Sequence, residues 1–311
     1  MTAAGTACLL RGVLPILPVP FSVTGTVDER SFRAVVEAAI GDGVHGLALF
    51  GLASEYAKLA DGEKLLLIRA LVDQASARVP VVISITHHSL DIARQEAAAA
   101  GRLGASALMV LPPFFLSPGE KAVEAHIRGI AAEVDLPVIV QYAPIQTGLH
   151  LSVDRLMALH SSHPNVDTIK VDLVPSGPMV TRLTAAGLQG MVGYMGLSLP
   201  EDVERGAVAV MPTASVSRIF VHLWNLLHDD PEQGRKFHHR FLPLLTFMMQ
   251  SVEMLVAVEK MILHRRGVIA TDYCRAPRWN LDAFHLREID RLCCEYADWL
   301  FDDESSTRRS G

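Results

Sequence analysis

Eight short apolar runs, each followed by a longer amphipathic stretch, constrain the fold of this 311-residue chain more than any other feature. The runs are rich in Val, Ile and Leu with little polar alternation, which is typical of strands buried on both faces of a parallel sheet. They cover residues 12–18, 44–50, 80–85, 107–111, 137–142, 166–171, 190–194 and 207–211. Eight strand–helix units in order predict an α/β chain with a closed (β/α)8 TIM barrel; an open doubly wound sheet is the alternative.

The stretches between these runs carry signals that start helices. In a capping box, a Ser or Thr and a Glu three residues later each satisfy a backbone N–H group at the helix start. Three pairs have this spacing, the last two with a Pro in the first turn: Thr26 with Glu29, Ser117 with Glu120, and Ser198 with Glu201. Each pair comes just after an apolar run, which supports the alternation of strands and helices.

The pattern changes after about residue 215, where it becomes purely helical. Residues 231–266 and 283–300 predict extra helices packed beside the barrel. The predicted organisation is a barrel over residues 1–225, a C-terminal helical extension over 226–300, and a frayed polar tail over 301–311.

Charge and cysteine content exclude several classes of protein. The chain carries 28 Lys and Arg against 34 Asp and Glu, which argues against a general nucleic-acid binder. Its four cysteines, none in CxxC spacing, argue against a disulfide framework and favour a reducing cytosol. The N-terminal residues lack a signal-peptide pattern, and no run of about 18 apolar residues occurs. We therefore expect a cytoplasmic protein with neither a nucleic-acid nor a membrane partner.

Lys170 is the strongest candidate for chemistry. Catalytic residues of barrels of this kind lie at the carboxyl ends of the strands. Of the six lysines, five lie in helix-like polar contexts, and Lys170 alone lies within a predicted strand. Burial disfavours the charged ammonium and frees the amine to attack a carbonyl group, which predicts a Schiff-base lysine. The alternative is a structural ion pair with Asp172 or Glu55.

Two further strand ends carry candidate site residues. Tyr142 ends the fifth predicted strand, where a phenol can transfer a proton to and from a substrate; an ordinary core Tyr is the alternative. After the second strand, successive backbone N–H groups could hold a carboxylate in the segment Gly51-Leu52-Ala53-Ser54-Glu55. Glu55 could be a catalytic acid or a helix cap, and we favour a structural role.

Metal and phosphate chemistry find little support in the sequence. His87 and His88 follow the third predicted strand, where solvated loop histidines are common. No HExxH motif occurs, so a metal site is not expected. No Walker loop occurs either, and the segment from Gly193 to Gly196 predicts a strand-to-loop turn.

In their order and spacing these residues resemble the dihydrodipicolinate synthase / N-acetylneuraminate lyase family, from about Gly12 to about Tyr296. The segment at Gly51 stands where the family has Gly-Thr-Thr-Gly-Glu, and Phe115 ends a match to its Pro-x-Tyr-Tyr segment. Tyr142 matches the catalytic Tyr, and Lys170 the Schiff-base Lys. Further matches are Gly193 and the segment 206–212 in the last two strands, and Cys274-Arg-Ala-Pro277 at the Arg-x-Pro signature.

The resemblance implies a (β/α)8 barrel with a C-terminal helical extension, usually assembled as a homotetramer; a homodimer is the other assembly we consider. It also implies a class I aldolase, lyase or dehydratase that condenses a 2-oxo acid, often pyruvate, with the Lys amine and needs no metal or organic cofactor. Lys170 would be the nucleophile and Tyr142 the proton shuttle. The implied substrate-binding residues are Leu52, Ala53, Ser54, Phe115 and Gly193, with the backbone of Leu52, Ala53 and Gly193 at the substrate carboxylate.

The chain also departs from the family pattern. Leu52 and Ala53 replace two hydroxyl residues, and Phe115 replaces a relay Tyr, so Tyr142 is the remaining relay hydroxyl. The family segment Tyr-Asn-x-Pro-x-Arg has become Tyr142-Ala-Pro-Ile-Gln146, without the Arg that receives a dicarboxylate substrate. These changes argue against lysine biosynthesis through dihydrodipicolinate and against sialic acid cleavage.

The predicted function is a Schiff-base lyase, either an aldolase or a dehydratase, acting on pyruvate or another 2-oxo acid through Lys170. The apolar residues Leu52, Ala53 and Phe115 favour a substrate with a more apolar tail, or a 2-oxo acid anchored differently. One alternative is a catalytically reduced family member that binds or senses a small molecule. Another is a lysine-imine enzyme that condenses an aldehyde with an amine or an arene.

Overall fold

The computed structural model describes residues 10–301, so Cys8 and the predicted tail at 302–311 lie outside the described residues. Over this range strands alternate with helices, and each of the eight predicted runs overlaps a strand. The strands are β1 (Gly12–Val13), β2 (Leu47–Leu49), β3 (Val81–Ile85), β4 (Ala107–Val110), β5 (Val138–Tyr142), β6 (Thr168–Val171), β7 (Gln189–Val192) and β8 (Ala209–Val210). Nearly all of their residues are buried, as expected for strands covered by helices.

The described chain divides into two compact units. Unit 1 comprises residues 10–12 and 80–210, and unit 2 comprises residues 13–79 and 211–301. The predicted boundary between residues 225 and 226 lies inside helix α9 (Ser217–Asp229) of unit 2.

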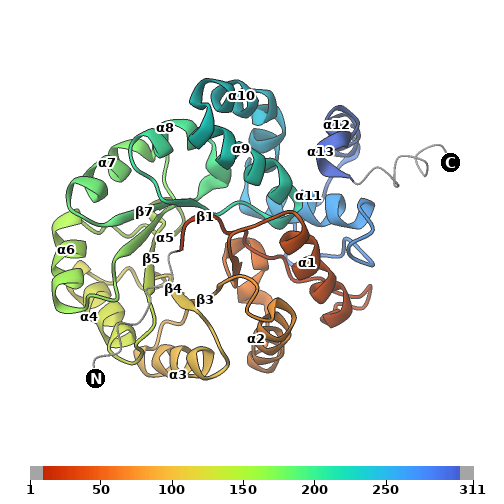
Figure 1. Ribbon diagram of the computed structural model, residues 1–311. Helices are drawn as coiled ribbons and strands as arrows, with labels where there is room; N and C mark the ends of the chain where they lie inside the picture. The colour runs from red at the N-terminus through yellow and green to blue at the C-terminus, as the bar shows by residue number, and fades with distance from the viewer. Residues whose placement is uncertain (1–9, 302–311) are drawn as a thin grey trace. The chain divides into compact units, whose positions relative to one another are not determined.

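Unit 1 is built on parallel strands that pair in chain order from β3 to β8. Gln141, Lys170 and Met191 lie side by side in this register on β5, β6 and β7. Figure 1 shows its longer helices outside the strands. These helices are α3 (Leu90–Arg102), α4 (Glu120–Ala131), α6 (Val153–Ser162), α7 (Gly177–Ala185) and α8 (Leu199–Glu204), and a single turn, α5 (Pro144–Thr147), follows β5.

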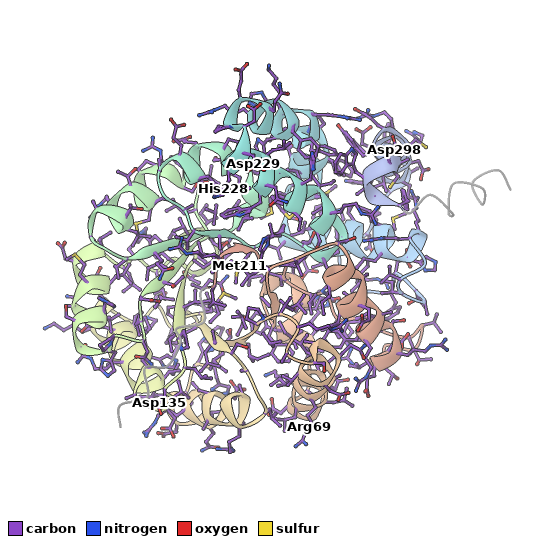
Figure 2. The ribbon with its side chains drawn as sticks, viewed as in Figure 1. Arg69, Asp135, Met211, His228, Asp229 and Asp298 are labelled. Atoms are coloured by element: carbon purple, nitrogen blue, oxygen red, sulfur yellow. The ribbon has the colours of Figure 1, made fainter. Side chains whose placement is uncertain are left out.

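Unit 2 contains β2 and two groups of helices. Ile16 forms parallel bridges to both Ala48 and Thr213. Helices α1 (Glu29–Gly41) and α2 (Asp61–Ala75) pack together, and α9 packs against α10 (Pro231–Met248) (Figure 1). The predicted helices after residue 230 are confirmed as α10, α11 (Val252–Arg265), α12 (Ala283–Glu295) and α13 (Ala297–Leu300). Figure 2 labels Met211, a buried residue directly after β8, and Asp229 at the end of α9.

Aromatic rings join three of the C-terminal helices. Phe237 and Phe241 of α10 lie with their ring centroids 4.9 and 5.8 Å from that of Trp299 on α13. His222 of α9 lies 4.9 Å from the same indole. Because aromatic pairs in edge or tilted geometry contribute beyond the area that they bury, this cluster fixes α13 against α9 and α10.

The helix starts differ from the predicted capping boxes. Thr26 does not cap α1: the cap is Asp28, whose carboxylate accepts a hydrogen bond from the Ser31 N–H at 3.0 Å. Helix α4 begins after Gly119, so the prediction for Ser117 was also wrong. Ser198 is the cap residue of α8, but its side chain makes no capping hydrogen bond. Asp28 displaces Thr26 because an Asp directly at the helix start is at least as good a cap.

No single helix within residues 10–301 has both the length and the hydropathy needed to cross a membrane. The pair α10 and α11, bent by 113° at a short break, reaches both values only when the two helices are taken together.

Candidate active site

Lys170 lies one residue before the end of β6 and is 5% exposed. Its Nζ donates a hydrogen bond to Oδ2 of Asp172 at 2.7 Å, and the two residues form an ion pair. Side chains two residues apart on extended backbone leave the same face, which is why this pair meets. The structure thus contains the Asp172 ion pair that was predicted as the alternative role of Lys170.

Gln141 completes a buried triad with these two residues. It is 2% exposed and lies beside Lys170 in the register of β5 and β6. Its Nε2 donates to the same oxygen, Oδ2 of Asp172, at 2.6 Å. One carboxylate oxygen therefore accepts hydrogen bonds from an ammonium and from an amide, and this pairing satisfies a carboxylate that is itself only 5% exposed.

Gly193 follows β7 and makes room for this carboxylate. A Cβ at this position would lie 1.6 Å from Oδ1 of Asp172 and 3.3 Å from Cε of Lys170, so only glycine allows this approach. The Gly193 N–H donates to the carbonyl oxygen of Val171 at 3.1 Å. Gly193 thus lies beside Asp172, and its N–H group is engaged within the sheet. Its role at the substrate carboxylate stays a prediction.

Tyr142 differs from its predicted setting. It pairs in register with Val171, one residue out of phase with Gln141 and Lys170, so its side chain leaves the opposite face of the sheet. Burial raises the pKa of its phenol. The shuttle role of Tyr142 stays a prediction.

The family motif Tyr-Asn-x-Pro-x-Arg supplies the signal that points to Gln141. In that motif the Tyr stands three residues before the Pro, and three residues before Pro144 stands Gln141. Aligned on this proline, Tyr142 takes the place of the motif's Asn and Gln146 the place of its Arg. The position relative to Pro144 therefore points to Gln141, which is the side chain beside Lys170, although its residue type differs from the motif's Tyr.

A second polar contact joins the segments that follow β5 and β7. Gln146 donates from Nε2 to the phenol oxygen of Tyr194 at 2.9 Å. Tyr194 and Met195, directly after Gly193, have φ of 49° and 54°, in the left-handed region that costs a non-glycine residue energy. Two strained residues in succession at a strand end are typical of positions that a functional site constrains.

Phe115 lies on the loop after β4 and is 78% exposed. His88 accepts a hydrogen bond at Nε2 from the Phe115 N–H at 3.1 Å and packs edge-on against Phe114. These residues line an apolar groove of about 430 Å³. His88 is thus a loop-fixing residue in unit 1, and His87 accepts a hydrogen bond at Nδ1 from the Ser89 N–H at 3.0 Å.

Leu52, Ala53 and Ser54 form a single 3-10 turn in unit 2, preceded by Gly51. The Ser54 hydroxyl donates to Leu17 O at 2.6 Å and accepts from the Phe50 N–H at 3.1 Å, so it fixes this turn from within. The first N–H groups of such a turn have no partner inside it, and these belong to Leu52 and Ala53. Their role in binding a carboxylate stays a prediction.

Glu55 belongs to a buried ion-pair network, and its side chain makes no helix-capping hydrogen bond, which was the structural role that we favoured. It is buried and accepts hydrogen bonds from Nζ of Lys260 and, at 3.1 Å, from Nζ of Lys58. The Arg275 N–H donates to the same side chain at 3.1 Å, which ties the Arg-x-Pro segment to Glu55. The prediction that Lys260 lies in a polar context was wrong, because this lysine is 0% exposed on α11.

Comparison with known proteins agrees with this arrangement. The model of the dihydrodipicolinate synthetase family matches residues 9–294. The chain belongs to this family. A 4-hydroxy-tetrahydrodipicolinate synthase of Salinibacter ruber is 28% identical over 278 residues, 87% of each chain. An L-2-keto-3-deoxyarabonate dehydratase of Azospirillum brasilense is 26% identical over 278 residues, 86% of this chain and 88% of that protein.

Solved structures give the same family fold. The dihydrodipicolinate synthase of Aquifex aeolicus superposes with a TM-score of 0.87 at 21% identity, covering 94% of this chain and all of the other. The predicted (β/α)8 TIM barrel with C-terminal helices is confirmed by this family of structures. As a dihydrodipicolinate synthetase family member, the chain is a class I aldolase-type lyase.

Among residues 10–301, no cluster of three or more His, Cys, Asp or Glu side chains could hold a metal ion.

Proposed function

We propose that the protein forms a Schiff base between Lys170 and pyruvate or another 2-oxo acid. The observation that carries this proposal is the placement of Lys170: a buried amine at the carboxyl end of β6, held by one carboxylate. The position of Lys170 at the carboxyl end of a barrel strand, where catalytic groups of this fold lie, distinguishes it from the buried Lys260, which lies on a helix.

The imine supplies the chemistry that follows. Once protonated, it withdraws electrons from the neighbouring carbon, so that cleavage of a carbon–carbon bond or loss of a hydroxyl group leaves an enamine. Relatives with both kinds of name, a synthase and a dehydratase, support an aldolase-type or a dehydratase reaction. The apolar residues Leu52, Ala53 and Phe115 favour a 2-oxo acid with a more apolar tail than the family's usual substrates.

The remaining roles belong to the same proposal. The sequence predicts Tyr142 as the proton shuttle, but its side chain leaves the opposite face of the sheet from Lys170, so this proposal assigns it no step. Leu52 and Ala53 bind the substrate carboxylate through backbone N–H groups. We further propose a cytosolic homotetramer or homodimer. Sedimentation of the purified protein at several concentrations measures its assembly, and a monomer at all of them would contradict it.

Intact mass tests the Schiff base directly. The protein is incubated with pyruvate, or with a larger 2-oxo acid, and reduced with sodium borohydride. A mass gain of one reduced adduct is expected for the wild type and for Lys236→Ala, whose lysine forms an exposed pair with Glu232. No adduct is expected for Lys170→Ala. An adduct that survives in Lys170→Ala would contradict the assignment.

A second candidate function follows from the Tyr142 side chain, which leaves the opposite face of the sheet from Lys170, and from the missing hydroxyls at Leu52 and Phe115. A family member with few relay groups could bind a carbonyl compound without turning it over. Imine formation with every 2-oxo acid in a broad panel, but no product from any of them, would favour this binding role. A condensation product with an added amine or arene, identified by its mass, would instead favour the other imine chemistry.

A further inference from the structure

The role of Asp172 is not accounted for by the family's chemistry. Its Oδ2 accepts hydrogen bonds from Lys170 Nζ at 2.7 Å and from Gln141 Nε2 at 2.6 Å. Its Oδ1 faces the main chain at Gly193, where a Cβ would collide with it. A buried ion pair is by itself weak evidence for stability. The pair with Lys170 alone therefore does not explain why Asp172 is also bonded to Gln141 and packed against Gly193.

Imine formation needs a group that moves protons. Nζ must lose protons before and after it attacks, and the carbonyl oxygen must gain protons to leave as water. The residues that would do this by family resemblance are changed: Leu52 and Phe115 carry no hydroxyl, and the Tyr142 side chain leaves the opposite face of the sheet from Lys170. Asp172 is the acid–base group in direct contact with Nζ.

We infer that Asp172 is a catalytic residue that carries the proton between Lys170 Nζ and the oxygen of the substrate carbonyl. This inference rests on the proposed function of Lys170. It gives a catalytic role to a residue that the sequence predicts only as a possible ion-pair partner of Lys170.

The step balances without a further reactant. A proton moves from the Nζ ammonium to Oδ2, which leaves a neutral amine and a carboxylic acid. The amine lone pair forms the C–N bond while the carbonyl π pair moves to oxygen, and one nitrogen proton passes to that oxygen. The carboxylic acid then returns its proton to the resulting hydroxyl, which leaves as water as the nitrogen lone pair closes the C=N bond. The products are an iminium, a carboxylate and water.

The charge in the buried site is the same before and after this step. An ammonium beside a carboxylate becomes an iminium beside the same carboxylate, so no net charge is created in a region of low dielectric. Gln141 is a positioning residue here, because its amide holds Oδ2 against Nζ. Gly193 permits the close approach of the other oxygen.

The test follows the rate of imine formation. Aliquots of protein with pyruvate or the preferred 2-oxo acid are quenched with sodium borohydride at successive times and weighed. Asp172→Asn, which keeps the size of the side chain but not its charge, should slow adduct formation on the order of 100-fold at pH 7. A rate within about threefold of the wild type would overturn the inference.

The control is a second buried aspartate of unit 1. Asp202 on α8 is fully buried and accepts hydrogen bonds from the Ser176 hydroxyl at 2.8 Å, with no part in the triad. Asp202→Asn should therefore lower stability without slowing the adduct. Equal slowing in both variants, measured where both are folded by circular dichroism, would reduce Asp172 to a structural role and overturn the inference.

Chemical rescue separates catalysis from packing. Asp172→Ala leaves room for a small carboxylate, and added formate should restore adduct formation in a saturable manner. A folded Asp172→Ala protein that formate does not rescue would overturn the inference. Failure of the proposed function looks different: the wild type itself would then form no adduct with any 2-oxo acid or aldehyde.

Discussion

Gln141 and Lys170 lie side by side on β5 and β6, and both donate to one oxygen of Asp172. Strand pairing places them in one layer of the sheet, and the residue after β6 closes the triad. The arrangement joins a nucleophile, its counter-ion and a neutral support through a single acceptor atom. A substitution of any one of the three residues should therefore alter the position and hydrogen bonding of the other two.

Removing the neutral support tests how strongly the triad holds Asp172. Gln141→Leu deletes a hydrogen bond to a buried charge and should lower the free energy of unfolding by about 1.5–3 kcal/mol. Gln146→Leu removes a neutral bond, to Tyr194, and should cost only about 0.5–1.5 kcal/mol. Urea denaturation of both variants makes the comparison, and equal losses would contradict the charge assignment.

Adding one methyl group should disturb the triad from the next strand. Gly193→Ala puts a Cβ 1.6 Å from Oδ1 of Asp172, so that carboxylate must move, at a cost of about 1–3 kcal/mol and with loss of the Lys170 adduct. Gly190→Ala on the same strand β7 meets nothing closer than 3.6 Å and is the matched control. Thermal unfolding and borohydride trapping measure both effects.

The buried lysine of unit 2 should matter for stability. Lys260→Met leaves Glu55 with less positive charge in a buried place, and we expect a loss of about 3–5 kcal/mol. Lys236→Met breaks an exposed pair with Glu232 and should change stability by less than about 1 kcal/mol. A loss at Lys260 no larger than at Lys236, by chemical denaturation, would show that the other partners of Glu55 suffice.

Glu259 should make stability depend on pH. Burial raises its pKa from 4.5 to about 8, while one oxygen accepts from the Ala214 N–H at 2.9 Å. The folded state then holds this proton between about pH 4.5 and 8, where the unfolded state has lost it, so stability falls as pH rises through that window. The slope is on the order of 1 kcal/mol per pH unit. Glu259→Gln should flatten it in melting curves taken from pH 5 to 9; an unchanged slope would assign it to other groups.

Restoring hydroxyls tests the carboxylate-binding prediction. Leu52→Thr with Ala53→Thr should lower KM for pyruvate by about 2- to 10-fold per hydroxyl that reaches the carboxylate. Steady-state kinetics, or the concentration dependence of adduct formation, gives the answer. If binding of pyruvate does not improve in a folded double variant, these positions do not hold the carboxylate.

The strands were predictable because a parallel sheet covered by helices needs uninterrupted apolar runs, and all eight overlap real strands. The helix starts were less predictable. Thr26 and Asp28 are both suitable caps for α1, and the sequence alone does not determine which of them forms the capping hydrogen bond. The burial of Lys260 was not predicted because its partner Glu55 lies 205 residues away in the sequence. The two failures have different causes: the cap is decided between neighbouring residues, whereas the burial of Lys260 depends on a contact between distant segments.

The triad shows the same limit at the site. Lys170 stood out because a lysine in a strand is rare, and Asp172 was named as its possible partner. Gln141 was passed over for Tyr142, since a phenol is the more familiar proton carrier. Only strand register shows that Gln141 shares a layer with Lys170 and that Tyr142 does not. The residue type of Lys170 predicts the chemistry, whereas the register of β5 and β6 determines which side chains lie beside it.

The link between Glu55 and the late segments Lys260 and Arg275 has a practical consequence. A chain ending near residue 225 would retain Glu55 but would lack both the Lys260 ammonium and the Arg275 backbone N–H that bond to it. It would also end inside α9. Such a fragment would not be a minimal catalytic barrel but an incomplete protein, prone to aggregate. Fusion tags and shortened expression variants should therefore leave residues up to 301 intact.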